Sequence, residues 1–118
     1  MLCKKVRMNW ETLSNEDQLE QIKQASFQTP QVIFKHSTRC SISSTALNRL
    51  ERADMPEGID FYYLDLIQYR PLSAKVAAIF QLQHESPQVL LIKDGICIYD
   101  ESHMAIAMDE IVEHAFTH

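Results

Sequence analysis

The sequence predicts an α/β fold in which a four-stranded mixed sheet carries helices on both faces. Short runs rich in β-branched and aromatic residues alternate with segments whose apolar residues recur at helical spacing. Strands that are joined through a crossover helix lie parallel, with a right-handed connection. The dipeptide Asp94-Gly95 between two strand-like runs is a strong hairpin signal, so the last two strands are predicted to be antiparallel.

The first half of the chain is predicted to form a helix, a strand and a second helix. Ser14 or Asn15 can cap the leading helix, which continues to about Ser26. After Pro30, residues 31–36 are predicted to form a strand. The second helix begins at Ser41 and ends before Pro56. Its apolar residues at helical spacing are Ile42, Ala46, Leu50 and Ala53.

The second half supplies three strands and two helices. Strands are predicted at 59–66, 88–93 and 96–99. Pro71 suits the first turn of a helix whose apolar face is Leu72, Val76, Ile79 and Phe80. The last helix has Met104, Met108, Ile111, Val112 and Ala115 on its apolar face. After the leading helix the order is βαβαββα, which is the thioredoxin-like arrangement.

The length of the chain limits the number of domains, and its net charge limits the kinds of partner that it can bind. At 118 residues the chain has the size of one domain, so we expect a single thioredoxin-like domain over 1–118, with 1–8 as a loose N-terminal segment. The net charge is -5 and basic residues form no stripe, so nucleic acid is not an expected partner. No apolar run reaches the roughly 20 residues of a membrane span, and the N-terminus has no apolar signal region. We therefore expect a cytoplasmic protein that does not bind membranes.

Cys40 is the candidate nucleophile. The three cysteines, Cys3, Cys40 and Cys97, have spacings typical of neither a disulfide framework nor a zinc site. Cys40 lies between a predicted strand and a helix start, where unpaired N–H groups and the helix dipole stabilise a thiolate. Arg39 and His36 are expected to add positive charge. A thiolate is the nucleophile in disulfide exchange, so this placement favours a reactive role over a packing role.

The motif around Cys40 contains one thiol, because Ser43 stands where a Cys-x-x-Cys pair would have its second cysteine. A second thiol from elsewhere must then release the transferred group. Cys97 is predicted to face about Ile92, too far from Cys40 for a disulfide, so it is expected to be a packing residue. Cys3 is either a resolving thiol or an unreactive terminal cysteine.

The segments HSTRCSIS, HESPQVLLIKDG and ESH resemble the monothiol bacilliredoxins, the YtxJ-like family, from Met8 to about Phe116. The resemblance implies that Cys40 is the active thiol and Pro87 a cis proline. Ser86 and Gln88 would flank that proline in the substrate groove. The implied activity is removal of bacillithiol, a co-substrate and not a bound cofactor, from mixed disulfides of client proteins. Ser41 departs from the family, which more often has proline after the cysteine.

Two other functions stay open. One is a monothiol glutaredoxin-like protein that uses glutathione or holds an iron–sulfur cluster through Cys40. The other is a non-catalytic adaptor that binds a partner in the groove. We expect no metal site, because His36, His84 and His103 lack the spacing of zinc ligands. His84 and His103 either flank the groove or are ordinary surface residues.

Overall fold

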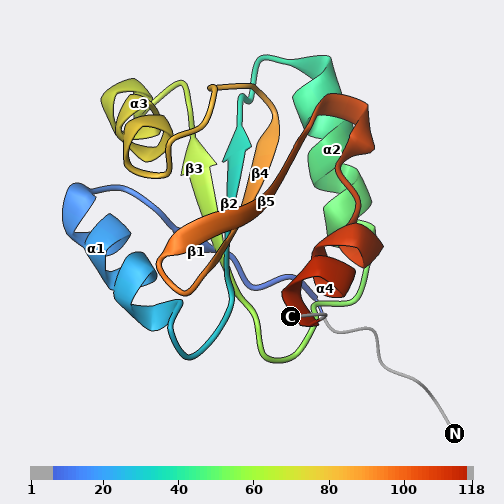
Figure 1. Ribbon diagram of the computed structural model, residues 1–118. Coiled ribbons are helices and arrows are strands. Elements are labelled where there is room, and N and C mark those ends of the chain that lie inside the picture. The colour runs from blue at the N-terminus through green and yellow to red at the C-terminus, as the bar shows by residue number, and fades with distance from the viewer. Residues whose placement is uncertain (1–6, 117–118) are drawn as a thin grey trace, which may run out of the picture.

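The computed structural model describes residues 7–116, so Cys3 and most of the predicted loose segment 1–8 lie outside the described residues. A five-stranded sheet forms the centre of the molecule, in the order β1-β3-β2-β4-β5 (Figure 1). Its strands are β1 (Glu11–Thr12), β2 (Gln31–His36), β3 (Asp60–Asp65), β4 (Gln88–Lys93) and β5 (Ile96–Ser102). The helices are α1 (Glu16–Ala25), α2 (Ser41–Arg52), α3 (Arg70–Ile79), the 3-10 helix η1 (His103–Ala105) and α4 (Met108–Phe116).

The predicted strand number was wrong by one. Strand β1 pairs parallel with β3 through Glu11 and Thr12 only, and two residues are too few to produce the alternation by which a strand is detected in a sequence. The remaining pairing is as expected. Strands β2 and β3 are parallel, β4 is antiparallel to β2, and β5 is antiparallel to β4.

Helices cover both faces of the sheet, with α1 and α3 on one face and α2 and α4 on the other (Figure 1). Successive residues of a strand point to opposite faces, so Phe34 and Ile33 of β2 belong to different core clusters. Phe34 packs with residues of α2 and α4, whereas Ile33 packs with residues of α1 and α3. Strand β2 is therefore buried on both sides, and its C-terminal end leads directly to Cys40.

The helix starts follow local chemistry. The side chain of Asn15 accepts a hydrogen bond from the N–H of Gln18, and the N–H of Asn15 donates to Gln18 Oε1, which together form a capping box at the start of α1. Helix α3 has Pro71 in its first turn, where a missing N–H costs nothing.

Two details of the predicted helices were wrong. Met104 is not on the last helix: β5 continues to Ser102, η1 follows, and α4 begins only at Met108. Ile42 is not on the buried face of α2, because it is 44% exposed while Ser43 is fully buried. Ser43, whose hydroxyl has hydrogen-bond partners inside the protein, thus takes a buried helix position where an apolar residue was predicted.

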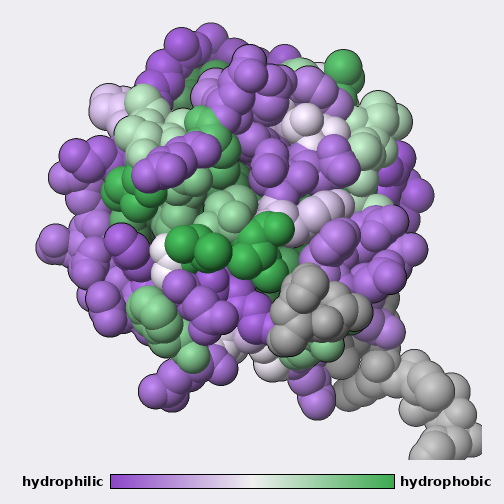
Figure 2. Space-filling model, in the orientation of Figure 1, coloured by the Kyte–Doolittle hydropathy of each residue, from purple (hydrophilic) through white to green (hydrophobic). Residues whose placement is uncertain are grey.

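The visible surface is mostly hydrophilic, with an apolar area over the β4–β5 hairpin (Figure 2). Ile96 and Ile98 of β5 are among the exposed large hydrophobic residues. Met8, at the end of the predicted loose segment, packs partly buried against the cluster that contains Phe34. Over residues 7–116 no helix is long and apolar enough to cross a membrane.

Candidate active site at the start of helix α2

Cys40 is the N-cap residue of α2, as its predicted position at the helix start required. Its backbone is extended, its N–H donates to the Ser37 carbonyl oxygen (3.2 Å), and its own carbonyl accepts from the N–H of Ser44 (3.0 Å). The thiol is half-buried, and the first turn of α2 has no acidic residue. Arg39 is exposed in the turn just before it. The sulfur therefore lies at the positive end of a helix dipole, with no carboxylate in the first turn to offset it.

Ser43 and His36 hold the segment before Cys40 against the first turn of α2. The Ser43 hydroxyl accepts a hydrogen bond from the Ser37 N–H (3.0 Å) and lies 2.7 Å from His36 Nδ1. A hydroxyl that accepts from an N–H still has its own proton to donate, and a neutral imidazole can accept it. Ser43 is thus a buried positioning residue, which the Cys-x-x-Ser spacing alone did not indicate.

His36 does not supply the positive charge that was predicted for it. The imidazole is almost fully buried and stacks on Phe34, with ring centroids 5.7 Å apart. Burial lowers the pKa of His36, although a hydrogen bond with Ser43 and the charges of Asp65 and Glu51 oppose this shift. His36 is therefore mostly neutral near pH 7, and its contribution is to orient Ser43.

This lowered pKa predicts a loss of stability in mild acid. Between the lowered pKa of folded His36 and the value of about 6.5 in the unfolded chain, the unfolded state binds more protons, so the free energy of unfolding falls as the pH drops. Burial, followed by the charge of Lys35, lowers the pKa of His84 and adds to the effect. In urea titrations from about pH 7 to about pH 5, His36→Gln is expected to show a shallower decline than the wild type. An unchanged slope would contradict the assignment of a buried neutral His36.

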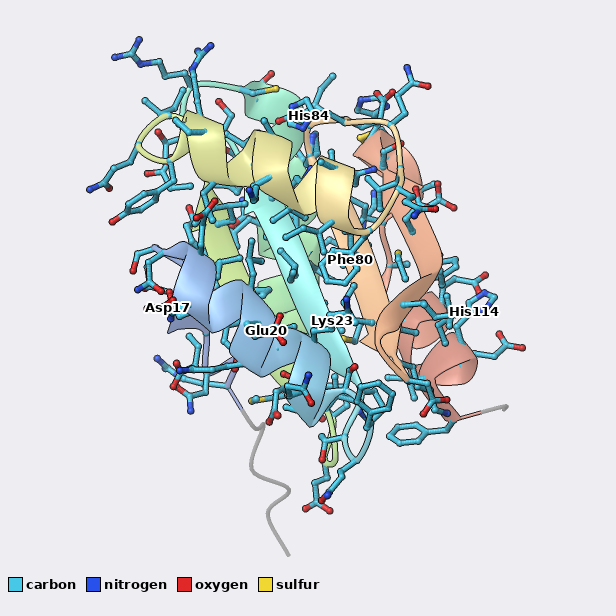
Figure 3. All side chains as sticks on the ribbon, turned by 60° about the vertical axis from the view of Figure 1, so that its left-hand side comes forward. Asp17, Glu20, Lys23, Phe80, His84 and His114 are labelled. Carbon is cyan, nitrogen blue, oxygen red and sulfur yellow. The ribbon has the colours of Figure 1, made fainter. Side chains whose placement is uncertain are left out.

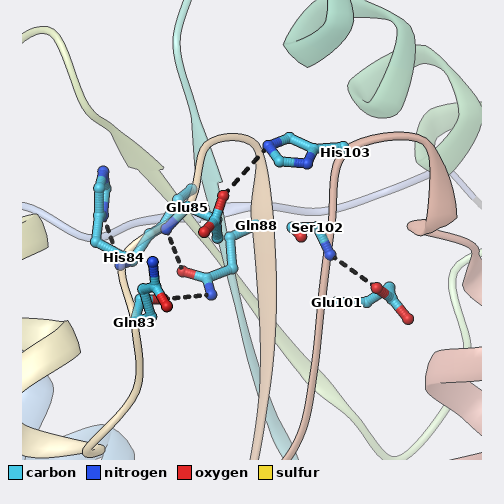
Figure 4. A network of polar contacts seen from close by, with 8 residues as sticks. Gln83, His84, Glu85, Gln88, Glu101, Ser102 and His103 are labelled. Carbon is cyan, nitrogen blue, oxygen red and sulfur yellow. Dashed lines mark hydrogen bonds and ion pairs between the residues drawn. The ribbon is translucent and has the colours of Figure 1, made fainter.

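Pro87 lies at the entry to β4, and the Ser86–Pro87 peptide bond is cis. Pro87 is buried, and its carbonyl oxygen accepts a hydrogen bond from the His103 N–H (3.0 Å). Gln88 is fully buried: its Nε2 donates to the Gln83 carbonyl oxygen (3.1 Å) and its Oε1 accepts from the Glu85 N–H at 3.4 Å (Figure 4). The amide of Gln88 thus holds the loop that presents Ser86 and Pro87.

His103 belongs to the same network. Its Nε2 lies 3.5 Å from Glu85 Oε1, which joins the start of η1 to the loop before β4 (Figure 4). His103 is exposed and has a positive φ of 58°. Its side chain and its backbone N–H therefore both contact the loop that contains Pro87, whereas His103 is not among the residues that line the hollow described next.

A hollow of about 480 Å³ opens beside this loop. Its walls come from the segment before Cys40, the end of β3, helix α3 and the loop before β4. The lining residues are Ser37, Leu66, Ile67, Arg70, Ser73, Ala74, His84 and Ser86. In Figure 3, His84 lies near α3 at the end of the sheet where β2 leads into α2, and α1 covers the other end.

Lys35 lies behind one wall of this hollow and was missed as a site residue. It is fully buried in β2, with Nζ 3.2 Å from His84 Nδ1. Burial lowers the pKa of Lys35 to about 8. The sequence does contain a signal, because a lysine inside a buried central strand is unusual. Arg70 and Ser73, which line the hollow, were also missed, since they lie on α3, far from Cys40 in the sequence.

Cys97 lies at the other end of the sheet. It pairs with Ile92 as predicted, and Ile92 in turn pairs with Gln31, where β2 begins rather than where it ends. Burial raises the pKa of Cys97 to about 11, so its thiol is protonated near neutral pH. Cys97 packs against the core cluster that contains Ile33, which agrees with a packing role. Within residues 7–116 no three His, Cys, Asp or Glu side chains are grouped to hold a metal ion.

Comparisons with solved structures define the class of protein. A protein described as an oxidoreductase with a thioredoxin fold is 30% identical, with a TM-score of 0.74 over 88% of this chain and 90% of that one. Thioredoxin from Malassezia sympodialis is 18% identical over 96% of this chain and 97% of its own, with a TM-score of 0.75. Thioredoxin from Schistosoma mansoni is also 18% identical, over 91% and 94% of the two chains, with a TM-score of 0.70. The protein is a thioredoxin-fold thiol oxidoreductase.

A match to a protein-family model assigns the chain to one family within this class. Residues 11–111 match the monothiol bacilliredoxin BrxC family, so the chain belongs to that family. The resemblance found in the sequence is thereby confirmed.

Proposed function

We propose that this protein removes bacillithiol from mixed disulfides of client proteins, with Cys40 as the nucleophile. The observation that carries the proposal is a single half-buried thiol at the N-terminus of α2, with a buried serine in place of a second thiol. Membership of the monothiol bacilliredoxin family supports bacillithiol as the co-substrate. A cytoplasmic location is part of the proposal, because a reducing compartment keeps such a thiol free.

The proposed reaction is a thiol–disulfide exchange. The Cys40 thiolate attacks the bacillithiol sulfur, a disulfide forms between Cys40 and bacillithiol, and the bond to the client sulfur breaks. The electron pair leaves with the client sulfur as a thiolate, so the total number of disulfides is unchanged. A second thiol then attacks the bacillithiol sulfur of this disulfide, Cys40 leaves as the thiolate, and bacillithiol ends in a disulfide with the second thiol.

The surroundings of Cys40 suit contact with a protein substrate. Ile42, two residues after Cys40, is exposed, and so is Met104 of η1. Arg49 of α2 holds η1 in place, because its Nη1 donates to the carbonyl oxygens of Met104 (2.6 Å) and Ile106 (3.1 Å). In the proposal, Ile42 and Met104 contact the client while Ser86 and Pro87 face its disulfide.

The test uses one client protein with a single cysteine. This cysteine is prepared in two forms, as the mixed disulfide with bacillithiol and as the mixed disulfide with glutathione, and the two reactions are compared. With the bacillithiol form, intact mass spectrometry is expected to show a freed client thiol and one bacillithiol on the protein. This adduct is expected to persist until an external thiol is added, unless Cys3 resolves it. Equal rates with the glutathione form would favour a glutaredoxin-like activity instead. If the client were unchanged in both reactions, the proposed removal of bacillithiol would be refuted, and the non-catalytic adaptor function would remain.

A further inference from the structure

A buried ammonium group without a carboxylate partner lies beside the candidate site. Lys35 is fully buried, and its Nζ lies 3.2 Å from His84 Nδ1, which in turn lies 3.3 Å from Ser73 Oγ. No ion pair joins Lys35 to a carboxylate within residues 7–116. Burial of a charge is costly unless a partner compensates it, and the hydrogen bond with His84 and the thiol of Cys97 are weaker partners for an ammonium group than a carboxylate. An anion bound beside the Lys35–His84 pair would therefore stabilise the charged form of Lys35.

The hollow next to Lys35 is placed to receive such an anion. His84, which contacts Lys35, and Ser73, which contacts His84, form part of its wall, and Arg70 at the start of α3 also lines it. Among residues 7–116, none that lines it carries a carboxylate. A volume of about 480 Å³ is in the range of pockets that hold small ligands. A planar guanidinium is well suited to bind a carboxylate with two parallel hydrogen bonds.

The hollow is also adjacent to the proposed reacting group. Ser37, which lines it, accepts a hydrogen bond from the backbone N–H of Cys40. Ser86, which also lines it, precedes Pro87 in the loop held by Gln88. The hollow thus borders both the segment that leads to Cys40 and the loop that contains Pro87.

We propose that this hollow binds the carboxylate-bearing part of the low-molecular-weight thiol, with Arg70 as the direct carboxylate ligand and the Lys35–His84 pair as a second cationic wall. The inference rests on the proposed function and names the part of the co-substrate that the site recognises. For bacillithiol this part is the malyl group. Arg70 and Lys35 are thus specificity residues, and the client protein is held elsewhere.

The experiment uses one client protein in two forms, the bacillithiol mixed disulfide and the mercaptoethanol mixed disulfide, which has no carboxylate. Arg70→Gln is expected to lower kcat/KM at least about tenfold for the bacillithiol form and to leave the mercaptoethanol form unchanged, since hydrogen bonds between charged groups contribute that much. Lys35→Met, which keeps the length of the buried side chain, is expected to act in the same direction. Arg52→Gln removes an exposed arginine at the far end of α2 and is the matched control.

A direct binding measurement separates this proposal from the proposed function. S-methylated bacillithiol cannot exchange, so calorimetry reports its binding whether or not transfer occurs. Binding to the wild type that weakens about tenfold in Arg70→Gln supports the site, even if transfer is absent. If Arg70→Gln lowered kcat/KM equally for the two client forms, Arg70 would contact the client protein or stabilise the fold instead of binding the carboxylate. That result, or unchanged binding of S-methylated bacillithiol to Arg70→Gln, would overturn the proposal.

Discussion

Cys40→Ser is expected to abolish transfer of bacillithiol from client proteins, to the rate of the uncatalysed exchange. A hydroxyl is a far weaker nucleophile than a thiolate near neutral pH, and it cannot form the disulfide intermediate. The measurement is release of the client thiol over time together with the intact mass of the protein. The fold should be unaffected, because the thiol of Cys40 makes no capping hydrogen bond at the start of α2.

Cys97→Ser is the matched control. Burial raises the pKa of the Cys97 thiol to about 11, so this thiol is not expected to react. The Cys97→Ser variant should therefore transfer bacillithiol at the wild-type rate. If Cys40→Ser still transferred bacillithiol, the double variant Cys40→Ser/Cys97→Ser would be measured next. Loss of the remaining transfer in the double variant would show that Cys97, and not Cys40, is the nucleophile.

Phe34→Ala is expected to lower the free energy of unfolding by about 4 kcal/mol, as is typical of large-to-small changes in a core. Phe34 is fully buried in the middle of β2, stacks on Trp10 at a centroid distance of 5.7 Å, and packs with residues of α2 and α4. Its removal leaves a cavity beneath the helix that begins after Cys40. The midpoint of thermal unfolding should fall by roughly 15 °C for a domain of this size.

Phe116→Ala is the comparison for this variant, because Phe116 is 54% exposed at the end of α4. Its effect on the free energy of unfolding should stay within about 1 kcal/mol. Urea unfolding followed by tryptophan fluorescence measures both variants. A loss of less than about 1 kcal/mol in Phe34→Ala would mean that the core under α2 is not packed as described.

Most of the fold could be predicted because its signals are local. A capping residue at Asn15, the apolar run of β2, the first-turn Pro71 and the Asp94-Gly95 turn each act over a few residues, and their order restricts the topology. The errors arose where a local pattern was too short or misleading. Strand β1 has two residues and exists because β3 offers it a free edge. Met104 fits a helical spacing, but the chain forms η1 before α4 begins.

The sequence by itself determined the position of Cys40, because one short segment places it after a strand and at a helix start. It also indicated the remote position of Cys97, since the register of a tight hairpin depends on its turn residues. Only the tertiary structure decided what surrounds the thiol. Lys35, His84 and Arg70 lie far apart in the sequence, on β2, on the loop before β4 and on α3. Packing of α3 against the sheet brings them to one hollow, and burial determines that His36 is neutral while Lys35 lacks a carboxylate partner among the described residues.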